Sequence, residues 1–138
     1  MIQTRLSGWY WQIKLAVAVV VVLVADQVSK WAAEVVDWPM VLNSGVAFGW
    51  RPAGEWLTFG LVALVGVGAA ASWQQYRRAP IISGLFLGGV LSNLTDRIFF
   101  GGVRDWLALP FTGLYNNIAD WAIALAVIIA LQRIFYKK

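Results

Sequence analysis

The sequence contains neither cysteine nor histidine among its 138 residues. The lack of cysteine excludes disulfides, iron–sulfur clusters and cysteine proteases, and the lack of histidine excludes a Ser-His-Asp triad. The usual zinc ligand sets are missing as well. We therefore expect no metal and no cofactor, and acid–base chemistry must come mainly from seven carboxylates. These are Asp26, Glu34, Asp37, Glu55, Asp96, Asp105 and Asp120.

Charged residues are scarce, at 13%, whereas 60% of the residues are hydrophobic. A soluble domain is about half apolar and about a quarter charged. The sequence also has nine tryptophans, which are typical of the interfacial belts of membrane proteins. A membrane-spanning helix needs about 20 residues. We therefore predict that residues 1–138 form a single integral membrane domain with four helices.

The charges that interrupt the apolar sequence indicate where these helices lie. Only the charge-free segment Trp56–Tyr76 is long enough to span a membrane unaided, so the first and last helices must continue past Asp26 and Asp120. The first helix is expected to be retained, because Leu23 and Ala25 form a poor cleavage site for a secretory signal peptide. We predict helices near residues 12–36, 55–76, 80–99 and 116–135.

The basic residues indicate the orientation of the helices, because cytoplasmic loops carry an excess of Lys and Arg. With both termini in the cytoplasm, all acidic residues fall on the outer half and most basic residues fall inside. The inner basic residues are then Arg5, Lys14, Arg77, Arg78, Arg133, Lys137 and Lys138. The prediction is an all-α membrane protein with N-in/C-in topology. The motif NSGVAFG, in the first outer loop, predicts a short strand or turn and hence a small β-like extracytoplasmic segment.

Two of the aspartates lie deep within the predicted helices. Counted at about 1.5 Å per residue from Lys14 and Arg133, Asp26 and Asp120 lie about 18–20 Å into a hydrocarbon core of about 30 Å. A carboxylate at that depth is a candidate for function unless it is paired. Asp26 has Lys30 one turn further along the same face, which favours a structural ion pair. Asp120 has no basic residue within one turn, which favours a chemical role.

The block GGVLSNLTDR of the third helix combines small and polar residues. Asn93 shares a helix face with Asp96 and with Arg97. Consecutive residues of a helix point in different directions, so the partners of this Asp and Arg are expected elsewhere in the chain. Small residues such as Gly84 and Gly89 let a neighbouring helix approach closely, and packing is their simplest role.

Asp105, in the second outer loop, and Asp120 are separated by enough chain for the loop to fold back between them. Two close carboxylates cannot both ionise easily, so they can share one proton. One then acts as base on a water molecule while the other protonates the leaving amine. Such a pair hydrolyses a peptide bond without Ser, Cys, His or metal. On spacing alone, a catalytic dyad of Asp105 and Asp120 is one hypothesis, and a structural role for either aspartate remains an alternative.

Five short motifs follow one another along the chain: D-x-x-x-K (26–30), N-x-G-x-A-F (43–48), N-x-x-D-R (93–97), V-x-D-W (103–106) and N-x-A-D (117–120). Their order resembles that of the lipoprotein signal peptidase (signal peptidase II) family, from Asp26 to about Trp121. The resemblance implies a multi-pass aspartic endopeptidase of the bacterial inner membrane, with its active site near the extracytoplasmic face.

The resemblance also implies roles for individual residues. Asp105 and Asp120 match the catalytic pair. The residues that line or orient the site are then Asn43, Asn93, Arg97 and Asn117. The expected supporting residues are Asp26, Lys30, Asp96, Gly45 and Gly89.

The implied substrate is a prolipoprotein whose cysteine carries a diacylglyceryl group, cut just before that cysteine. Acyl chains held between helices would supply binding energy remote from the reacting carbonyl. Membrane lipids are the other expected partner, nucleic acid is not expected, and the chain is expected to act as a monomer. Ser92 replaces a glycine usual in the family. The segment 107–115 is short where the family has an amphipathic helix over the site, so selectivity and gating are the expected points of difference.

Two other classes of function remain as alternatives. A non-catalytic relative that binds lipoproteins or signal peptides would have no reason to retain both Asp105 and Asp120. A small proton-coupled transporter needs a polar path to the cytoplasm, but the inner halves of the predicted helices are uncharged. Topology explains the basic pairs Arg77–Arg78 and Lys137–Lys138 without nucleic-acid binding.

Overall fold

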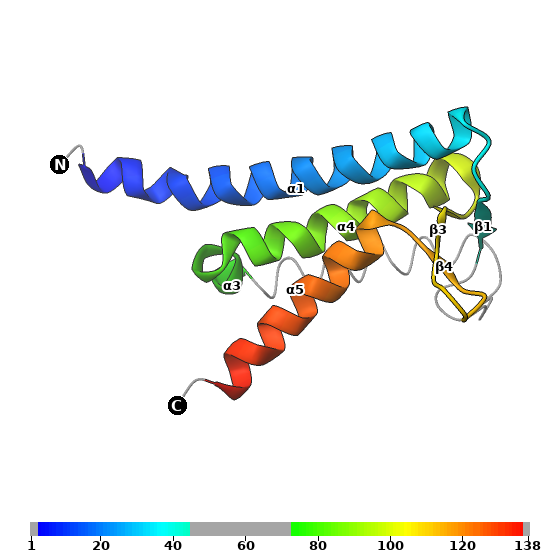
Figure 1. Cartoon of the computed structure of the whole chain (residues 1–138). Coiled ribbons are helices and arrows are strands. Elements are labelled where there is room, and N and C mark those ends of the chain that lie inside the picture. Colours follow the sequence, from blue (N-terminus) through cyan, green and yellow to red (C-terminus); the bar gives the residue numbers. More distant parts are fainter. Residues whose placement is uncertain (1–2, 45–72, 137–138) are drawn as a thin grey trace.

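The computed structural model describes residues 3–44 and 73–136. Within them the order of elements is α1 (Gln3–Val35), β1 (Val41–Asn43), α3 (Trp73–Arg78), α4 (Pro80–Phe100), β2 (Val103–Asp105), β3 (Leu107–Ala108), β4 (Tyr115–Asn116) and α5 (Ile118–Phe135). Helix α4 packs against both α1 and α5, and the short strands gather at one end of these helices (Figure 1). The protein is mostly helical, as predicted. The helix predicted near 55–76 lies outside the described residues except for 73–76, which belong to α3.

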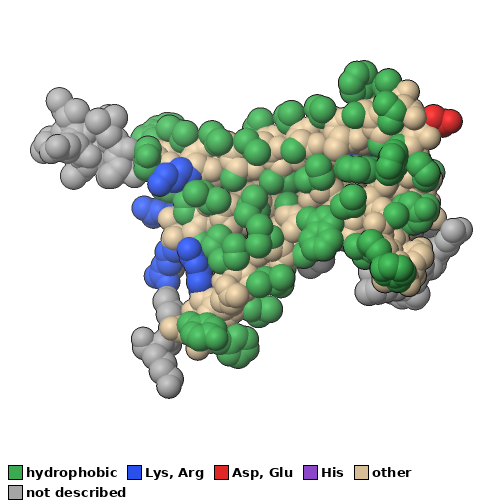
Figure 2. All heavy atoms as spheres, in the orientation of Figure 1, with side chains coloured by type: hydrophobic (Ala, Val, Ile, Leu, Met, Phe, Trp, Pro, Cys, Tyr) green, Lys and Arg blue, Asp and Glu red, His purple; other side chains and the backbone are tan. Residues whose placement is uncertain are grey.

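Helix α1 is a continuous helix that begins well before the expected start near residue 12. The expected boundary followed the charge of Lys14, but a single basic residue does not interrupt a helix. Among the described residues, the segment Trp9–Val35 is the one stretch of helix long and apolar enough to cross a membrane. Several of its valines are exposed, including Val17, Val21 and Val24, and hydrophobic side chains line the outside of α1 in Figure 2. Such a surface suits contact with acyl chains.

Glycines on α4 allow its neighbours to approach closely. A Cβ atom on Gly84 would lie 2.5 Å from the Cβ of Ala18, and one on Gly88 would lie 2.8 Å from the Cβ of Val22. On the side facing α5, a Cβ on Gly89 would lie 2.6 Å from the carbonyl oxygen of Ala119. The predicted packing role of these glycines is confirmed. It brings the polar faces of all three helices into one interior.

The ends of α4 and α5 direct the chain toward the strands. Pro80 begins α4, where its missing N–H costs no helical hydrogen bond. Gly101 ends it in the left-handed conformation (φ 74°), and its N–H donates to the carbonyl of Arg97 at 3.2 Å. Asn117 caps the start of α5 by accepting the backbone N–H of Asp120 at 2.9 Å. The last helix therefore starts at Ile118, two positions later than expected.

Two small antiparallel sheets form the β segment. Strand β1 pairs with β2 in a register that sets Val41 opposite Asp105, and β3 pairs with β4 as a hairpin. The β-like extracytoplasmic segment was predicted from NSGVAFG. Asn43 of that motif ends strand β1, and residues 45–49 lie outside the described residues. The segment 107–115 forms no covering helix. Its Pro110 and Gly113 favour a turn, so the chain folds back as a hairpin with Phe111 fully exposed near its tip.

Candidate active site

Asp105 and Asp120 come from different elements to the same end of the helices. Asp105 ends strand β2, is only 2% exposed, and accepts hydrogen bonds from two asparagines. Its Oδ1 accepts the side-chain amide of Asn117 at 2.6 Å, and its Oδ2 accepts that of Asn43 at 3.1 Å. Asp120, in the first turn of α5, accepts the amide of Asn93 on its Oδ1 at 2.7 Å. Neutral amides thus hold both carboxylates.

Asn117 links the two aspartates directly. Its NH2 group donates to Asp105, and its carbonyl oxygen accepts the backbone N–H of Asp120 at 2.9 Å. Only one orientation of the side-chain amide satisfies both contacts, because an amide has donors at one end and an acceptor at the other. The two carboxylates also lie close enough to interact electrostatically. The structure therefore brings the predicted pair together.

The surroundings of Asp105 favour proton exchange near neutral pH. Burial raises the pKa of this carboxyl to about 6, and the negative charge of Asp120 acts in the same direction. The hydrogen bonds from Asn117 and Asn43 favour the ionised form and limit the rise. A carboxyl with a pKa in this range is suited to general acid–base chemistry, because both of its forms are accessible.

Arg97, the remaining predicted orienting residue, also lies at this site. Its Nη1 donates to the backbone carbonyl of Asn93 at 3.2 Å. Its guanidinium interacts electrostatically with both Asp120 and Asp105. A fixed positive charge of this kind can stabilise a pair of carboxylates that carries one proton. The sequence predicted that Arg97 and Asn93 share a helix face. The observed hydrogen bond joins them across a spacing of four residues, as this prediction requires.

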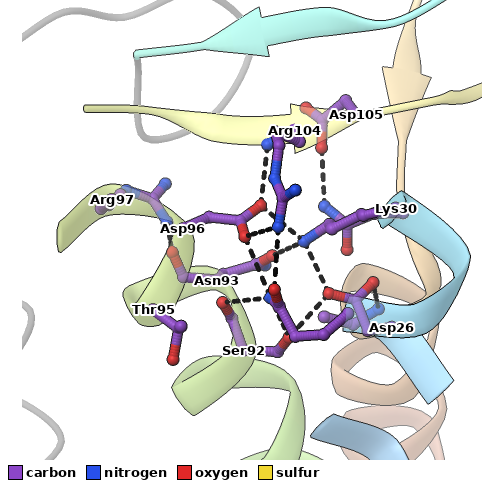
Figure 3. A network of polar contacts seen from close by, with 12 residues as sticks. Asp26, Lys30, Ser92, Asn93, Thr95, Asp96, Arg97, Arg104 and Asp105 are labelled. Atoms are coloured by element: carbon purple, nitrogen blue, oxygen red, sulfur yellow. Dashed lines mark hydrogen bonds and ion pairs between the residues drawn. The ribbon is translucent and has the colours of Figure 1, made fainter. Parts of the chain in front are cut away.

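Beside the two aspartates lies a fully buried ion-pair cluster (Figure 3). The Nζ of Lys30 is 2.6 Å from Asp26 Oδ2 and 2.9 Å from Asp96 Oδ2, and all three side chains are 0% exposed. Asp26 also accepts the backbone N–H of Ala119 at 2.9 Å, which joins α1 to the start of α5. The predicted pair of Asp26 and Lys30 is confirmed.

Arg104 was not among the predicted site residues. Its backbone N–H and its Nη2 each donate to Asp96 at 2.9 Å, so one residue contacts both oxygens of that carboxylate. Its guanidinium also stacks on the ring of Phe100 at 3.8 Å. Because Arg104 precedes Asp105 in β2, these contacts fix the strand that carries Asp105. The sequence analysis indicated that the partner of Asp96 lies elsewhere in the chain, but no spacing signal identified Arg104 as that partner.

Two further polar residues of the cluster were also missed. The hydroxyl of Ser92 donates to Asp26 Oδ2 at 2.7 Å. The amide of Gln27 donates to Ser92 Oγ and to Asp96 Oδ1, each at 2.9 Å, and its oxygen accepts Nη2 of Arg104 at 2.8 Å. Ser92 is therefore part of the buried network.

The other predicted supporting residues have simpler positions. Gly89 packs against α5 and Gly45 lies outside the described residues. Across the described segments 3–44 and 73–136, no group of three or more acidic or other ligating side chains is arranged to hold a metal ion.

Comparison with known proteins agrees with these features. The family model described as "Signal peptidase (SPase) II" matches residues 18–136. The chain belongs to the signal peptidase II family. Three similar relatives are each named lipoprotein signal peptidase. That of Rhizorhabdus wittichii is 34% identical over 82% of this chain and 80% of its own length. That of Nitrobacter hamburgensis is 34% identical over 88% and 91%, and that of Polynucleobacter necessarius is 30% identical over 79% and 80%.

Solved structures share the fold of this family member. A bacterial membrane enzyme determined by the in meso method at 1.9 Å resolution matches with a TM-score of 0.73 and 19% identity, covering 90% of this chain and 94% of that one. A second, at 2.3 Å resolution, matches with a TM-score of 0.71 and 20% identity, covering 90% and 91%. Membership of the signal peptidase II family makes the chain a membrane-associated peptidase.

Proposed function

We propose that this protein is an aspartic endopeptidase that removes the signal peptide from diacylglyceryl-modified prolipoproteins by cutting just before the lipidated cysteine. One observation carries the proposal. Asp105 and Asp120, from β2 and α5, meet at one site and are both held by the side-chain amides of asparagines. The relatives named lipoprotein signal peptidase support the choice of substrate.

The proposed reaction uses the two carboxylates in opposite protonation states. A water molecule between them attacks the peptide carbonyl while the ionised carboxylate accepts one of its protons. The protonated carboxyl then gives its proton to the leaving amine as the C–N bond breaks. One water is consumed, and the pair again holds one proton, the one taken from the water. Because the pKa of Asp105 is about 6, this carboxyl can exchange its proton under neutral conditions.

We further propose that the protein spans the bacterial inner membrane several times, with both termini inside and the site near the extracytoplasmic face. On the face shown in Figure 2, the visible lysines and arginines gather at one end of the molecule, and a small acidic patch lies at the other end. The basic end includes Lys14, Arg77 and Arg78. It is opposite the strands and the two aspartates, as the positive-inside rule requires for an outer site. The protein then acts as a monomer with membrane lipids around its apolar surface.

The lipid on the substrate explains how a small site can bind a long chain. Acyl chains that lie along the exposed apolar sides of the helices hold the substrate by surface burial, at a distance from the reacting carbonyl. Binding energy of this kind can be used to place the peptide bond beside Asp120. The hairpin β3–β4, with its exposed Phe111, stands where other members are expected to have a covering helix.

A cleavage assay in lipid tests the proposal. The protein is reconstituted with a diacylglyceryl-modified prolipoprotein, and loss of the signal peptide is followed on a gel. The variants Asp105→Asn and Asp120→Asn are expected to insert and purify normally but to lose turnover by about 10²- to 10⁴-fold, the usual contribution of general acid–base groups.

Asp37→Asn serves as the matched control for this assay. Asp37 is an exposed aspartate just after α1 with φ of 55°, a conformation that asparagine accepts readily. The control is expected to cleave like the wild type. Near-normal turnover by either dyad variant would contradict the proposal. Binding of uncut prolipoprotein by an inactive wild type would instead favour a non-catalytic binding role.

A further inference from the structure

The ammonium of Lys30 lies between the buried ion-pair cluster and the two aspartates. It contacts Asp26 and Asp96, and it donates to the side-chain oxygen of Asn93 at 3.4 Å. The NH2 group of the same Asn93 side chain donates to Asp120 at 2.7 Å. Figure 3 shows the contacts of Lys30 with the cluster and with Asn93. A continuous chain of contacts therefore runs from the cluster, through Lys30 and Asn93, to Asp120 of the proposed dyad.

Lys30 determines which way the amide of Asn93 points. An ammonium group has donors only, so it can face only the carbonyl end of an asparagine side chain. The NH2 end of Asn93 must then face Asp120. Without the ammonium this constraint is lost. A protonated Asp120, which has an O–H to donate, can then face the carbonyl end of the amide instead.

We propose that Lys30 is a positioning residue for peptide hydrolysis, which fixes Asn93 as a donor to Asp120 and maintains a positive charge beside both dyad carboxylates. This inference rests on the proposed function, because it assumes that Asp105 and Asp120 perform the chemistry. Lys30 does not touch the substrate, since its side chain is 0% exposed. Its effect reaches the reaction through Asn93 and through its charge.

The charge of Lys30 acts on groups from every described element around it. The acidic groups are Asp26 of α1, Asp96 of α4, Asp105 of β2 and Asp120 of α5, and the neighbouring cations are Arg97 of α4 and Arg104 of β2. Asp26 and Asp96 touch the ammonium directly. For Asp105, outside the helices, the positive charge of Lys30 lowers the pKa. Its removal must therefore raise that pKa.

The structure also shows how to remove Lys30 without leaving a carboxylate unpaired. Asp96 retains both contacts from Arg104 and the amide of Gln27 when Lys30 is absent. Asp26 is the group that would lose its cation. An asparagine there keeps an oxygen for the backbone N–H of Ala119, so Asp26→Asn/Lys30→Met removes one charge of each sign from the interior. Asp26→Asn alone is the matched control, because it weakens the same cluster and keeps the ammonium.

The test measures kcat, KM and the pH profile of prolipoprotein cleavage per folded enzyme. For Asp26→Asn/Lys30→Met, we expect kcat to fall by about 10- to 100-fold, as is usual when a residue that orients a functional side chain is lost. KM should stay within about twofold, because binding energy for the substrate comes from other surfaces. The part of the pH profile that reports Asp105, near pH 6, should move to higher pH. Asp26→Asn alone should be less stable, but because it keeps the ammonium it should retain most of the wild-type kcat and should not move the limb that reports Asp105 to higher pH.

Each outcome separates this inference from the proposed function. Wild-type kcat and an unmoved pH profile in the folded double variant would overturn the role of Lys30, while inactive Asp105→Asn and Asp120→Asn variants would leave the dyad in place. Active dyad variants would overturn the proposed function itself. Asp26→Asn/Lys30→Gln, which restores a donor without the charge, is measured if the Met variant does not fold. If neither folds while Asp26→Asn does, Lys30 serves folding, and the positioning role is abandoned.

Discussion

Two pairs of aspartates lie side by side in this protein, and their partners differ. Asp26, Asp96 and Asp105 are buried, and Asp120 is half-buried. Asp26 and Asp96 contact the ammonium of Lys30, and Asp96 also contacts the guanidinium of Arg104. Asp105 and Asp120 accept hydrogen bonds from the amides of asparagines instead. Both pairs consist of aspartates, and both lie at the same end of the helices, so the two pairs differ in their partners.

The difference in partners distinguishes the ion-paired aspartates from the pair proposed to perform the chemistry. A carboxylate that touches a buried cation is held ionised, because protonation would leave the cation uncompensated. A carboxyl surrounded by neutral amides exists in either form at moderate cost, and the pKa of about 6 for Asp105 reflects this balance. Burial alone therefore does not identify a reactive aspartate, and the nature of its nearest donors must be known.

The largest effect on stability is expected at the ion-paired carboxylates. Asp96→Asn leaves Arg104 without its buried anion and Lys30 with Asp26 alone. Breaking a buried pair in this way costs about 3–5 kcal/mol. Unfolding in detergent, followed by circular dichroism, should show a clearly lower melting temperature than the wild type. A variant as stable as the wild type would show that the cluster does not hold the fold.

A smaller loss of stability is expected from substitution of the buried Ser92. Ser92→Ala removes the hydrogen bond to the charged Asp26 and should cost about 1.5–3 kcal/mol, with cleavage by the folded enzyme unchanged. Thr95→Ala is the control, because its hydroxyl donates only to the neutral carbonyl of Leu91 on the same helix. Equal melting temperatures for the two variants would contradict the role given to Ser92.

The smallest expected effect is a shift of a pH profile. Asn43→Ala removes a hydrogen bond that favours the ionised form of Asp105. The pKa of Asp105 should therefore rise above 6, and the limb of kcat/KM that reports it should move to higher pH. Leu42→Ala, at the neighbouring exposed position of β1, should leave the limb in place. A shift to lower pH after Asn43→Ala would reverse the sign and contradict the assigned contact.

Local spacing was enough to predict several of these features. Asp26 and Lys30 are one turn apart, so their contact depends only on α1 being a helix. The close approach of α4 to its neighbours followed from the size of its glycines. The dyad itself needed the order of five motifs, because no spacing rule places Asp105 of a loop beside Asp120 of a helix.

The remaining contacts depend on how distant segments pack. Arg104 reaches Asp96 only because Gly101 reverses the chain after α4. Asn43 reaches Asp105 through the register of β1 with β2, which puts Asn43 diagonally across from the aspartate on one face. Segment 107–115 forms a hairpin and not a helix because it is short and contains the turn-forming residues Pro110 and Gly113. The sequence shows such residues but not the surface over which they fold.

The most direct test of the account is the equilibrium unfolding of Asp105→Asn beside that of Asp96→Asn at pH 7.5, with cleavage measured on the same samples. The pKa of Asp105 is raised in the folded protein from its ordinary 3.8 to about 6. The carboxyl therefore lowers stability as pH rises through that range, and the cost is fully present above it. The account predicts that Asp105→Asn is inactive and at least as stable as the wild type, whereas Asp96→Asn is strongly destabilised. An Asp105→Asn variant that unfolds as easily as Asp96→Asn and cleaves normally while folded would contradict it.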